Sequence, residues 1–115
     1  MEYNDSESIY IDPITGAKKG VKLARFDLIP PSSLFQLAEL YGKGAIKYGD
    51  RNWEAGYDYS KSFAALNRHL WKWWSGEDID LETEMNHLVS VAWHAFSLLH
   101  FIENYPEKDD RGVRS

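Results

Sequence analysis

The stretch EDIDLETEMNHLVSVAWHAFSLLHFIEN, residues 77–104, decides the fold. It opens with five carboxylates within eight residues and then becomes almost continuously apolar, while three histidines recur along it. The apolar run predicts a long helix that begins within residues 80–83 and ends near Asn104, before Pro106. A helix that is apolar on every face is normally buried on every face. We therefore expect other helices, and a second subunit, to cover it.

The five carboxylates at the start of this stretch have two interpretations. Acidic residues in the first turn of a helix stabilise it by about 0.3–1 kcal/mol each, which accounts for one or two of them. Crowding more of them in a chain of net charge −5 gains no stability, so the second interpretation is a bound cation. Oxygen-rich ligands favour Mg²⁺ or Mn²⁺ over structural zinc. The candidate ligands are Glu77, Asp80, Glu82, Glu84 and His87.

Helical spacing selects among these residues. Glu84 and His87 are three residues apart and would share one face of the predicted helix. His94 lies two turns further along that face, where a buried histidine is more often a hydrogen-bonded core residue than a ligand. His100 lies late in the helix, and we expect no function for it.

Two further helices precede this stretch. After Pro30 and Pro31, an apolar stripe at steps of three and four predicts a helix over residues 32–48. A turn-rich loop follows at residues 49–59, and a second helix is predicted over residues 61–75, capped by Ser60 and ended by Gly76. Residues 1–20 show no helical period and are expected to form a non-helical arm. Residues 106–115 are expected to form a flexible tail. The fold class is therefore all-α.

The composition of the 115-residue chain excludes several classes of protein. It has no cysteine, so disulfides, thiolate metal sites and cysteine catalysis are excluded. No run is apolar enough for a membrane span, and the first sixteen residues lack the basic start and apolar run of a signal peptide, so we expect a cytoplasmic protein. The acidic balance argues against a nucleic-acid partner, because neutralising phosphates requires a basic surface. Aromatic residues make up 15% of the chain, which favours oligomerisation or a pocket for a flat ligand.

The few basic and aromatic residues outside the long helix are candidates for binding a phosphorylated ligand. Lysine and arginine neutralise phosphate, and rings stack on bases. Each residue also has a structural interpretation: Lys47 in a solvated face, Trp53 or Tyr48 as an anchor for its loop, and Arg68 in a salt bridge between subunits. The candidates are Lys22, Arg25, Lys47, Arg51, Asn52, Trp53, Arg68 and His69. Neither a Walker P-loop nor a GxGxxG motif is present.

Three separated segments together carry a family resemblance: KLARFDLIPP at 22–31, GAIKYGDRNWEAG at 44–56, and RHLWKWWSGEDIDLET at 68–83 followed by His87. They resemble the phage and bacterial dATP/dGTP diphosphohydrolase family, a MazG-like group that includes the MazZ proteins. The resemblance covers residues 20–104. It implies a MazG-like helical bundle, with residues 21–105 as the catalytic domain, assembled as a homodimer or homotetramer.

The resemblance also implies an activity. The family hydrolyses purine deoxynucleoside triphosphates, dGTP or dATP, to the monophosphate and pyrophosphate with two or more Mg²⁺ or Mn²⁺ ions per site. This places such an enzyme in the remodelling of phage nucleotide pools for 2-aminoadenine DNA, in the host cytoplasm. MazG proteins carry Glu-x-x-Glu on one helix and Glu-x-x-Asp on the next, whereas this chain has Gln36-x-x-Glu39 and Glu84-x-x-His87.

From the residues, Glu54 or Glu84 is the candidate catalytic carboxylate that orients a water molecule activated by the metal ion. The competing hypothesis is a non-catalytic helical module for oligomerisation or interaction, suggested by the apolar helix and the five Trp residues. A phosphohydrolase of the His-Asp type is disfavoured, because the chain has no adjacent His-Asp pair.

Overall fold

The computed structural model describes residues 8–112, and the chain forms two compact units, residues 1–30 and residues 31–115. The units divide at Pro30, whereas the sequence predicted an arm that ended at residue 20. Residues 1–7 of the predicted arm and residues 113–115 of the predicted tail lie outside the described residues.

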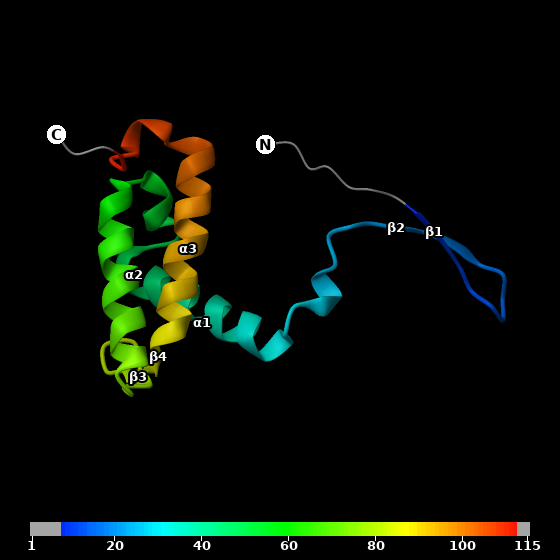
Figure 1. Ribbon diagram of the computed structural model, residues 1–115, viewed down its shortest axis with the longest axis horizontal. Helices are drawn as coiled ribbons and strands as arrows, with labels where there is room; N and C mark the ends of the chain where they lie inside the picture. Colours follow the sequence, from blue (N-terminus) through cyan, green and yellow to red (C-terminus); the bar gives the residue numbers. More distant parts are fainter. Residues whose placement is uncertain (1–7, 113–115) are drawn as a thin grey trace. The chain divides into compact units, whose positions relative to one another are not determined.

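The first unit carries a β-hairpin where the sequence predicted a non-helical arm (Figure 1). Strand β1, Ser8–Ile11, pairs antiparallel with β2, Lys18–Val21. The Asp12 carboxylate accepts hydrogen bonds from the backbone N–H groups of Ile14 and Thr15 and closes the turn. A short 3₁₀ helix, η1 at Phe26–Leu28, follows.

The second unit is mostly helical. Its helices are α1, Pro31–Tyr48; α2, Tyr59–Trp74; and α3, His87–Asn104. Helices α2 and α3 lie side by side, and α1 also packs on α3 (Figure 1). Two 3₁₀ helices, η2 at Asn52–Ala55 and η3 at Pro106–Lys108, and a small two-stranded sheet complete the unit. The expected all-α class therefore holds for the helices but omits both small sheets.

The first two helix predictions agree with the structure to within two residues. Pro31 begins α1 after the extended Ile29 and Pro30, as its fixed φ allows. Helix α2 begins at Tyr59 rather than after a Ser60 cap. Gly76, with φ 104°, ends it: Gly76 N–H donates to Trp73 O and Glu77 N–H donates to Lys72 O, the Schellman pattern.

The predicted start of the third helix is wrong, because a hairpin occupies the acidic residues. Strand β3, Ile79–Asp80, pairs antiparallel with β4, Met85–Asn86. The Asp80 carboxylate accepts hydrogen bonds from Glu82 N–H and Thr83 Oγ1, which fixes the turn between the strands. Helix α3 begins at His87, where the Asn86 side chain accepts from Leu88 N–H and caps it. Asn86 is the capping residue that marks the start of α3, and the sequence prediction placed the start among the acidic residues before it.

An aromatic cluster anchors the C-terminal end of α3. Phe101 is fully buried, with the Tyr57 ring edge-on at 4.9 Å and the Tyr59 ring at 6.4 Å. The Tyr59 hydroxyl donates to the backbone carbonyls of Phe101 and Tyr105, at 3.1 and 3.0 Å, in addition to the Tyr105 N–H that donates to Phe101 O. This cluster fixes the last turn of α3 against the start of α2.

Residues 106–112, expected as part of a tail, contact the helical unit. The Asp110 carboxylate accepts hydrogen bonds from the backbone N–H and the hydroxyl of Ser60, in the first turn of α2. An acidic group is favourable there because the first backbone N–H groups of a helix are unpaired. None of the helices in the described part of the chain is long and apolar enough to span a membrane.

Gly56 and Gly42 differ in their surroundings, so alanine substitutions at the two positions should differ in their effect on stability. Gly56 has φ 85°, and a Cβ built there would lie 2.9 Å from Cδ2 of the Tyr105 ring, whereas a Cβ on Gly42 in α1 would meet nothing within 4 Å. We expect Gly56→Ala to lower the free energy of unfolding by about 2 kcal/mol or more, through backbone strain and overpacking. Gly42→Ala should leave it unchanged or raise it by up to about 1 kcal/mol, because alanine is the better helix former.

Urea unfolding followed by circular dichroism would measure both variants. Equal destabilisation by the two substitutions would contradict the described contact between Gly56 and Tyr105.

Candidate active site

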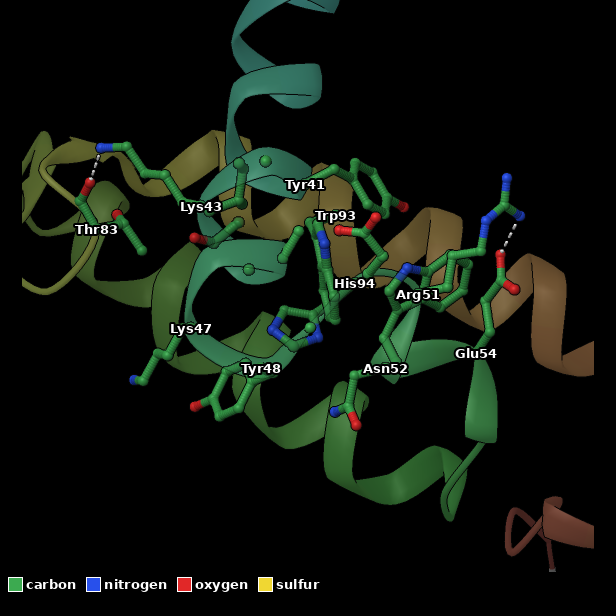
Figure 2. Close-up of a pocket in the computed structure, with 18 of the residues that line it drawn as sticks. Tyr41, Lys43, Lys47, Tyr48, Arg51, Asn52, Glu54, Thr83, Trp93 and His94 are labelled. Carbon is green, nitrogen blue, oxygen red and sulfur yellow. Dashed lines mark hydrogen bonds and ion pairs between the residues drawn. The ribbon is translucent and has the colours of Figure 1, made fainter.

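A cavity of about 1020 Å³ opens between the C-terminal half of α1, the loop that carries η2, and the inner faces of α2 and α3 (Figure 2). Lysine and arginine side chains stand at its edge, from Lys43, Lys47 and Arg51. Tyr41, Trp53 and Trp93 form an aromatic wall, with ring centroids 5.7–6.2 Å apart. His69, Asp80, Ser90 and His94 contribute polar groups to the same lining. The cavity therefore combines basic and aromatic side chains with histidine and carboxylate groups.

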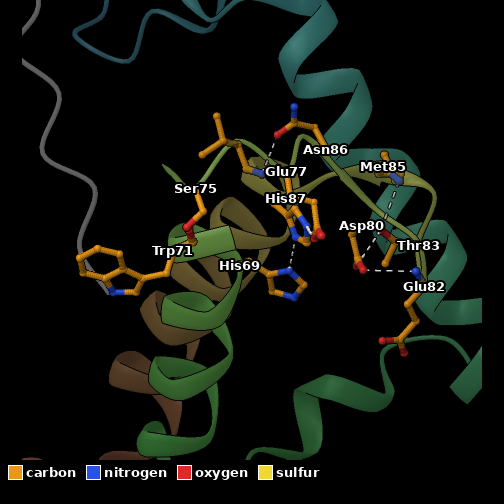
Figure 3. Close-up of polar contacts among 11 residues, drawn as sticks. His69, Trp71, Ser75, Glu77, Asp80, Glu82, Thr83, Met85, Asn86 and His87 are labelled. Carbon is orange, nitrogen blue, oxygen red and sulfur yellow. Dashed lines mark hydrogen bonds and ion pairs between the residues drawn. The ribbon is translucent and has the colours of Figure 1, made fainter. Parts of the chain in front are cut away.

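The His69–Asp80–His87 cluster brings together one residue from α2, one from β3 and the first residue of α3. One ligand atom from each of these side chains lies within 4.8 Å of the other two. Nδ1 of His69 and Nδ1 of His87 are 2.9 Å apart, with the two rings directed at each other (Figure 3). Asp80 is 8% exposed and His87 is fully buried.

The donor atoms of this cluster fit a divalent metal ion. Two imidazole nitrogens about 2.1 Å from one ion, at a right angle, would be about 3.0 Å apart, close to the distance observed. Two imidazoles and one carboxylate form a ligand set that proteins use for divalent transition ions.

A second carboxylate supports this arrangement from behind. His87 Nε2 lies 2.6 Å from Glu77 Oε2. If Nε2 carries the proton and donates it to Glu77, the His87 Nδ1 lone pair faces His69. Metal-binding histidines are commonly held in this way by a carboxylate at the other ring nitrogen.

The protonation of the cluster also suits a cation. Burial of His69 lowers its pKa, which keeps the ring neutral and able to ligate. Burial acts to raise the pKa of Asp80, but hydrogen bonds from Glu82 N–H and Thr83 Oγ1 outweigh it, and the pKa lies below its ordinary value. The carboxylate therefore stays ionised.

Two lysines of α1 hold the hairpin turn that carries Asp80. Lys43 Nζ donates to the Thr83 carbonyl at 2.5 Å, and Lys47 Nζ lies 3.3 Å from Glu82 Oε1 (Figure 2 shows the first contact). Lys43, which was not among the predicted site residues, thus has a specific contact. Lys47 lies at the cavity edge with Tyr48, whose ring centroid is 5.0 Å from its Nζ.

The structure separates the five predicted metal ligands. Asp80 and His87 belong to the cluster, and Glu77 contacts His87 from behind. Glu82 lines the cavity with its carboxylate directed to Lys47. Glu84 has φ 61° in the hairpin turn and lines a separate, smaller hollow with Gln36 and Glu39. The expectation that Glu84 and His87 share a helix face is therefore wrong, because Glu84 precedes the helix.

The predicted substrate-binding residues are also divided. Lys47, Arg51, Asn52, Trp53 and His69 line the cavity, and so does the predicted catalytic residue Glu54. Arg51 has φ 58° and pairs with Glu54 at 3.2 Å. Arg68 is exposed on α2 outside the lining. Lys22 and Arg25 belong to the first unit, where Arg25 pairs with Asp27 at 2.6 Å.

Trp53 packs edge-on against Tyr41 and His100, as an anchor for its loop would, and it also lines the cavity. Tyr48 is the more accessible ring, with 62% of its surface exposed.

His94 takes the hydrogen-bonded position that the sequence favoured for it. Its Nδ1 lies 3.0 Å from Ser62 Oγ, and burial lowers its pKa to about 4. Sequence reasoning missed His69 as a partner of His87, and it missed Ser90 and Tyr57 in the lining. One signal could have found this face: His87, Ser90, His94 and Ser97 are the polar residues of the largely apolar stretch from residue 87 to residue 99, and their spacing places them on a single stripe.

The fold and this cavity define a small, mostly helical domain with a histidine–carboxylate cluster beside a basic edge. Residues 13–111 match the family described as dATP/dGTP diphosphohydrolase, N-terminal, and the chain belongs to this family. It is also 30% identical over 98 residues to a protein of Salmonella phage PMBT28 named dATP/dGTP diphosphohydrolase. That alignment covers 85% of this chain and 33% of the relative, so the chain spans about a third of the length of the curated relative it matches. No solved structure matches the chain.

The ligand set predicted from the sequence and the His69–Asp80–His87 cluster differ in which substitutions should remove metal binding. We expect Mn²⁺ to bind the wild-type protein and to raise its melting temperature, since a ligand of the folded state stabilises it. His69→Ala should abolish this binding, and Glu77→Gln should weaken it by about 10–100-fold through loss of support for His87. Glu84→Gln should leave it unchanged. Isothermal titration calorimetry would measure the affinities, with circular dichroism to verify folding.

Loss of Mn²⁺ binding in Glu84→Gln, with retention in His69→Ala, would contradict the His69–Asp80–His87 cluster and restore the ligand set predicted from the sequence.

Proposed function

We propose that the cavity hydrolyses purine deoxynucleoside triphosphates, dATP or dGTP, to the monophosphate and pyrophosphate with the help of a divalent metal ion. The observation that carries this proposal is the His69–Asp80–His87 cluster, in which Asp80 and His87 are buried, beside a cavity edged with lysine and arginine. A polyphosphate needs cations on several sides, and a metal ion together with Lys47 and Arg51 would supply them. The family to which the chain belongs, and the name of the phage relative, supply the substrate class.

Mn²⁺ suits the proposed site better than Mg²⁺. Mg²⁺ prefers oxygen ligands in near-ideal octahedral geometry, whereas two of the three ligand atoms here are imidazole nitrogens. When bound, the ion would polarise a phosphoryl oxygen and lower the pKa of a water molecule. The family resemblance implies a second ion, which would have Glu82 and the phosphate oxygens of the substrate as ligands.

The residues around the cavity divide the remaining tasks. Lys47 and Arg51 would neutralise charge on the pyrophosphate leaving group. Tyr48 and Trp53 would contact the base, and Asn52 would offer an amide for hydrogen bonding. Glu54, the one predicted catalytic carboxylate that lines the cavity, would accept a proton from the attacking water.

The proposed reaction is displacement at the α-phosphorus. The water oxygen forms a bond to the α-phosphorus while the bond between the α-phosphorus and the α,β-bridging oxygen breaks. Pyrophosphate leaves with the electron pair of the broken bond, and the proton lost by water passes to the carboxylate of Glu54. The products are a deoxynucleoside monophosphate and pyrophosphate.

We further propose that the protein works as a homodimer or homotetramer, because α3 presents apolar side chains outward. Leu88, Phe96, Leu99 and Ile102 are 39–59% exposed, while the polar residues His87 and Ser97 on the same helix are fully buried. This arrangement reverses the usual pattern for a surface helix. It supports coverage by a second copy, whereas the proposal of catalysis over the non-catalytic module rests on the cavity and on the family. A role in phage nucleotide-pool remodelling for 2-aminoadenine DNA, in the host cytoplasm, stays a prediction.

Product analysis tests the proposed activity directly. We expect the protein to convert dATP or dGTP to the monophosphate and pyrophosphate in the presence of Mn²⁺. Ion-exchange chromatography would separate and identify the products. In water enriched in oxygen-18, the label should enter the monophosphate, because water attacks the α-phosphorus. Lys47→Ala should raise KM or lower kcat about tenfold or more, as expected for loss of a charge-assisted contact.

The matched control is Lys72→Ala on α2, which removes a lysine that does not line the cavity. Release of inorganic phosphate, label in the pyrophosphate, or no turnover of any deoxynucleotide with Mn²⁺ or Mg²⁺ would contradict the proposal.

A further inference from the structure

Three side chains form a hydrogen-bonded chain at the cavity wall, apart from the metal cluster. The Tyr57 hydroxyl lies 2.6 Å from Ser62 Oγ, and Ser62 Oγ lies 3.0 Å from His94 Nδ1. Ser62 is fully buried on α2, and both ends of the chain, Tyr57 and His94, line the cavity. A buried serine placed between two cavity residues restricts how each can rotate and donate.

The chemistry of the Tyr57, Ser62 and His94 side chains determines which group donates the hydrogen in each of the two hydrogen bonds. A phenol is a stronger acid than an alcohol, so Tyr57 donates to Ser62 Oγ. Ser62 cannot reach bulk water, and within residues 8–112 its hydroxyl has hydrogen bonds only with Tyr57 and His94. Leaving a buried hydroxyl hydrogen unpaired is costly. The Ser62 hydrogen therefore goes to His94 Nδ1, and the neutral His94 ring carries its own hydrogen on Nε2.

Nε2 is the ring nitrogen of His94 with no hydrogen bond to any described residue, while its ring lines the cavity (Figure 2). The ring stacks at 6.2 Å on His69, which belongs to the metal cluster. An N–H donor in this place would meet the part of a ligand that lies nearest the cluster. In a nucleotide bound through a metal ion, that part is the phosphate.

We propose that His94 donates its Nε2–H to a phosphoryl oxygen of the ligand, and that Ser62 and Tyr57 are positioning residues that fix the ring for this contact. The inference rests on the proposed function for the ligand class, a polyphosphate. It adds to that function a binding residue that is neither a metal ligand nor a positive charge. Because the donor is a neutral imidazole, it would recognise phosphate beside a cation without repelling that cation.

Two substitutions of His94 separate its two nitrogens. Asparagine places an amide near the position of Nδ1, so His94→Asn can keep the contact with Ser62 while removing the donor at Nε2. Glutamine reaches further and places an amide N–H near Nε2, so His94→Gln can keep the donor. His100→Asn is the matched control, because His100 lies on the same helix but does not line the cavity.

The test is the binding of inorganic tripolyphosphate to the full chain, measured by calorimetry with the protein saturated with Mn²⁺. We expect His94→Asn to weaken binding by about tenfold or more, as for loss of a hydrogen bond to a charged group. His94→Gln should restore most of the affinity, Ser62→Ala should lie between, and His100→Asn should match the wild type. The Mn²⁺ affinity should be unchanged in all four variants.

A second readout needs no ligand. Nitrogen-15 NMR of the histidine side chains in the metal-free protein distinguishes the two tautomers of a neutral ring. We expect the Nε2–H form for His94 in the wild type, and a mixture of the two forms in Ser62→Ala.

Several results would overturn the inference: an Nδ1–H tautomer in the wild type, wild-type tripolyphosphate affinity in His94→Asn, no tripolyphosphate binding by the wild type, or loss of Mn²⁺ binding in His94→Asn. Failure of the proposed function gives a different result. A protein that binds tripolyphosphate through His94 but hydrolyses no deoxynucleotide would lose the proposed activity and keep the assignment of His94.

Discussion

The buried ring of His87 is the constraint on which the arrangement of the site depends. Its Nε2 contacts Glu77, its Nδ1 faces His69, and its backbone N–H donates to the Asp78 carbonyl. One residue thus ties the end of α2, the hairpin and the start of α3. Two facing imidazole nitrogens repel unless one donates a hydrogen to the other or both bind a cation. The same contact therefore stabilises the fold as a hydrogen bond and, in the proposed function, becomes the metal site.

Helix α3, which begins at His87, buries polar side chains on one side and exposes apolar side chains on the other. His87, Ser90 and Ser97 are buried, although serine and histidine are usually found at surfaces, and large apolar residues such as Phe96 and Leu99 are exposed. On the inward side, Ser90 lines the cavity and His87 belongs to the His69–Asp80–His87 cluster, while the outward apolar side chains are exposed. The same helix would then serve catalysis on one side and assembly on the other, as we propose.

The sequence predicted the helices because their ends are marked by backbone chemistry: Pro31 fixes the start of α1, and Gly76 ends α2. It also predicted the family, through three motifs that occur together. It could not predict the hairpin at β3 and β4, because strands of two residues have no readable period. It could not show that Asp110 contacts Ser60, or that His69 faces His87, because both contacts join distant residues in the sequence. Glu84 was wrongly placed in the helix because the two-residue strands of this hairpin could not be recognised from the sequence.

We propose that His69, Asp80 and His87 together hold a divalent metal ion. Anomalous diffraction from crystals soaked in Mn²⁺ would test it most directly. We expect a peak in contact with Nδ1 of His69, Nδ1 of His87 and the Asp80 carboxylate, with Glu77 hydrogen-bonded to Nε2 of His87. A peak at Glu82 or Glu84 alone, or no peak beside His69 at full soaking, would contradict it.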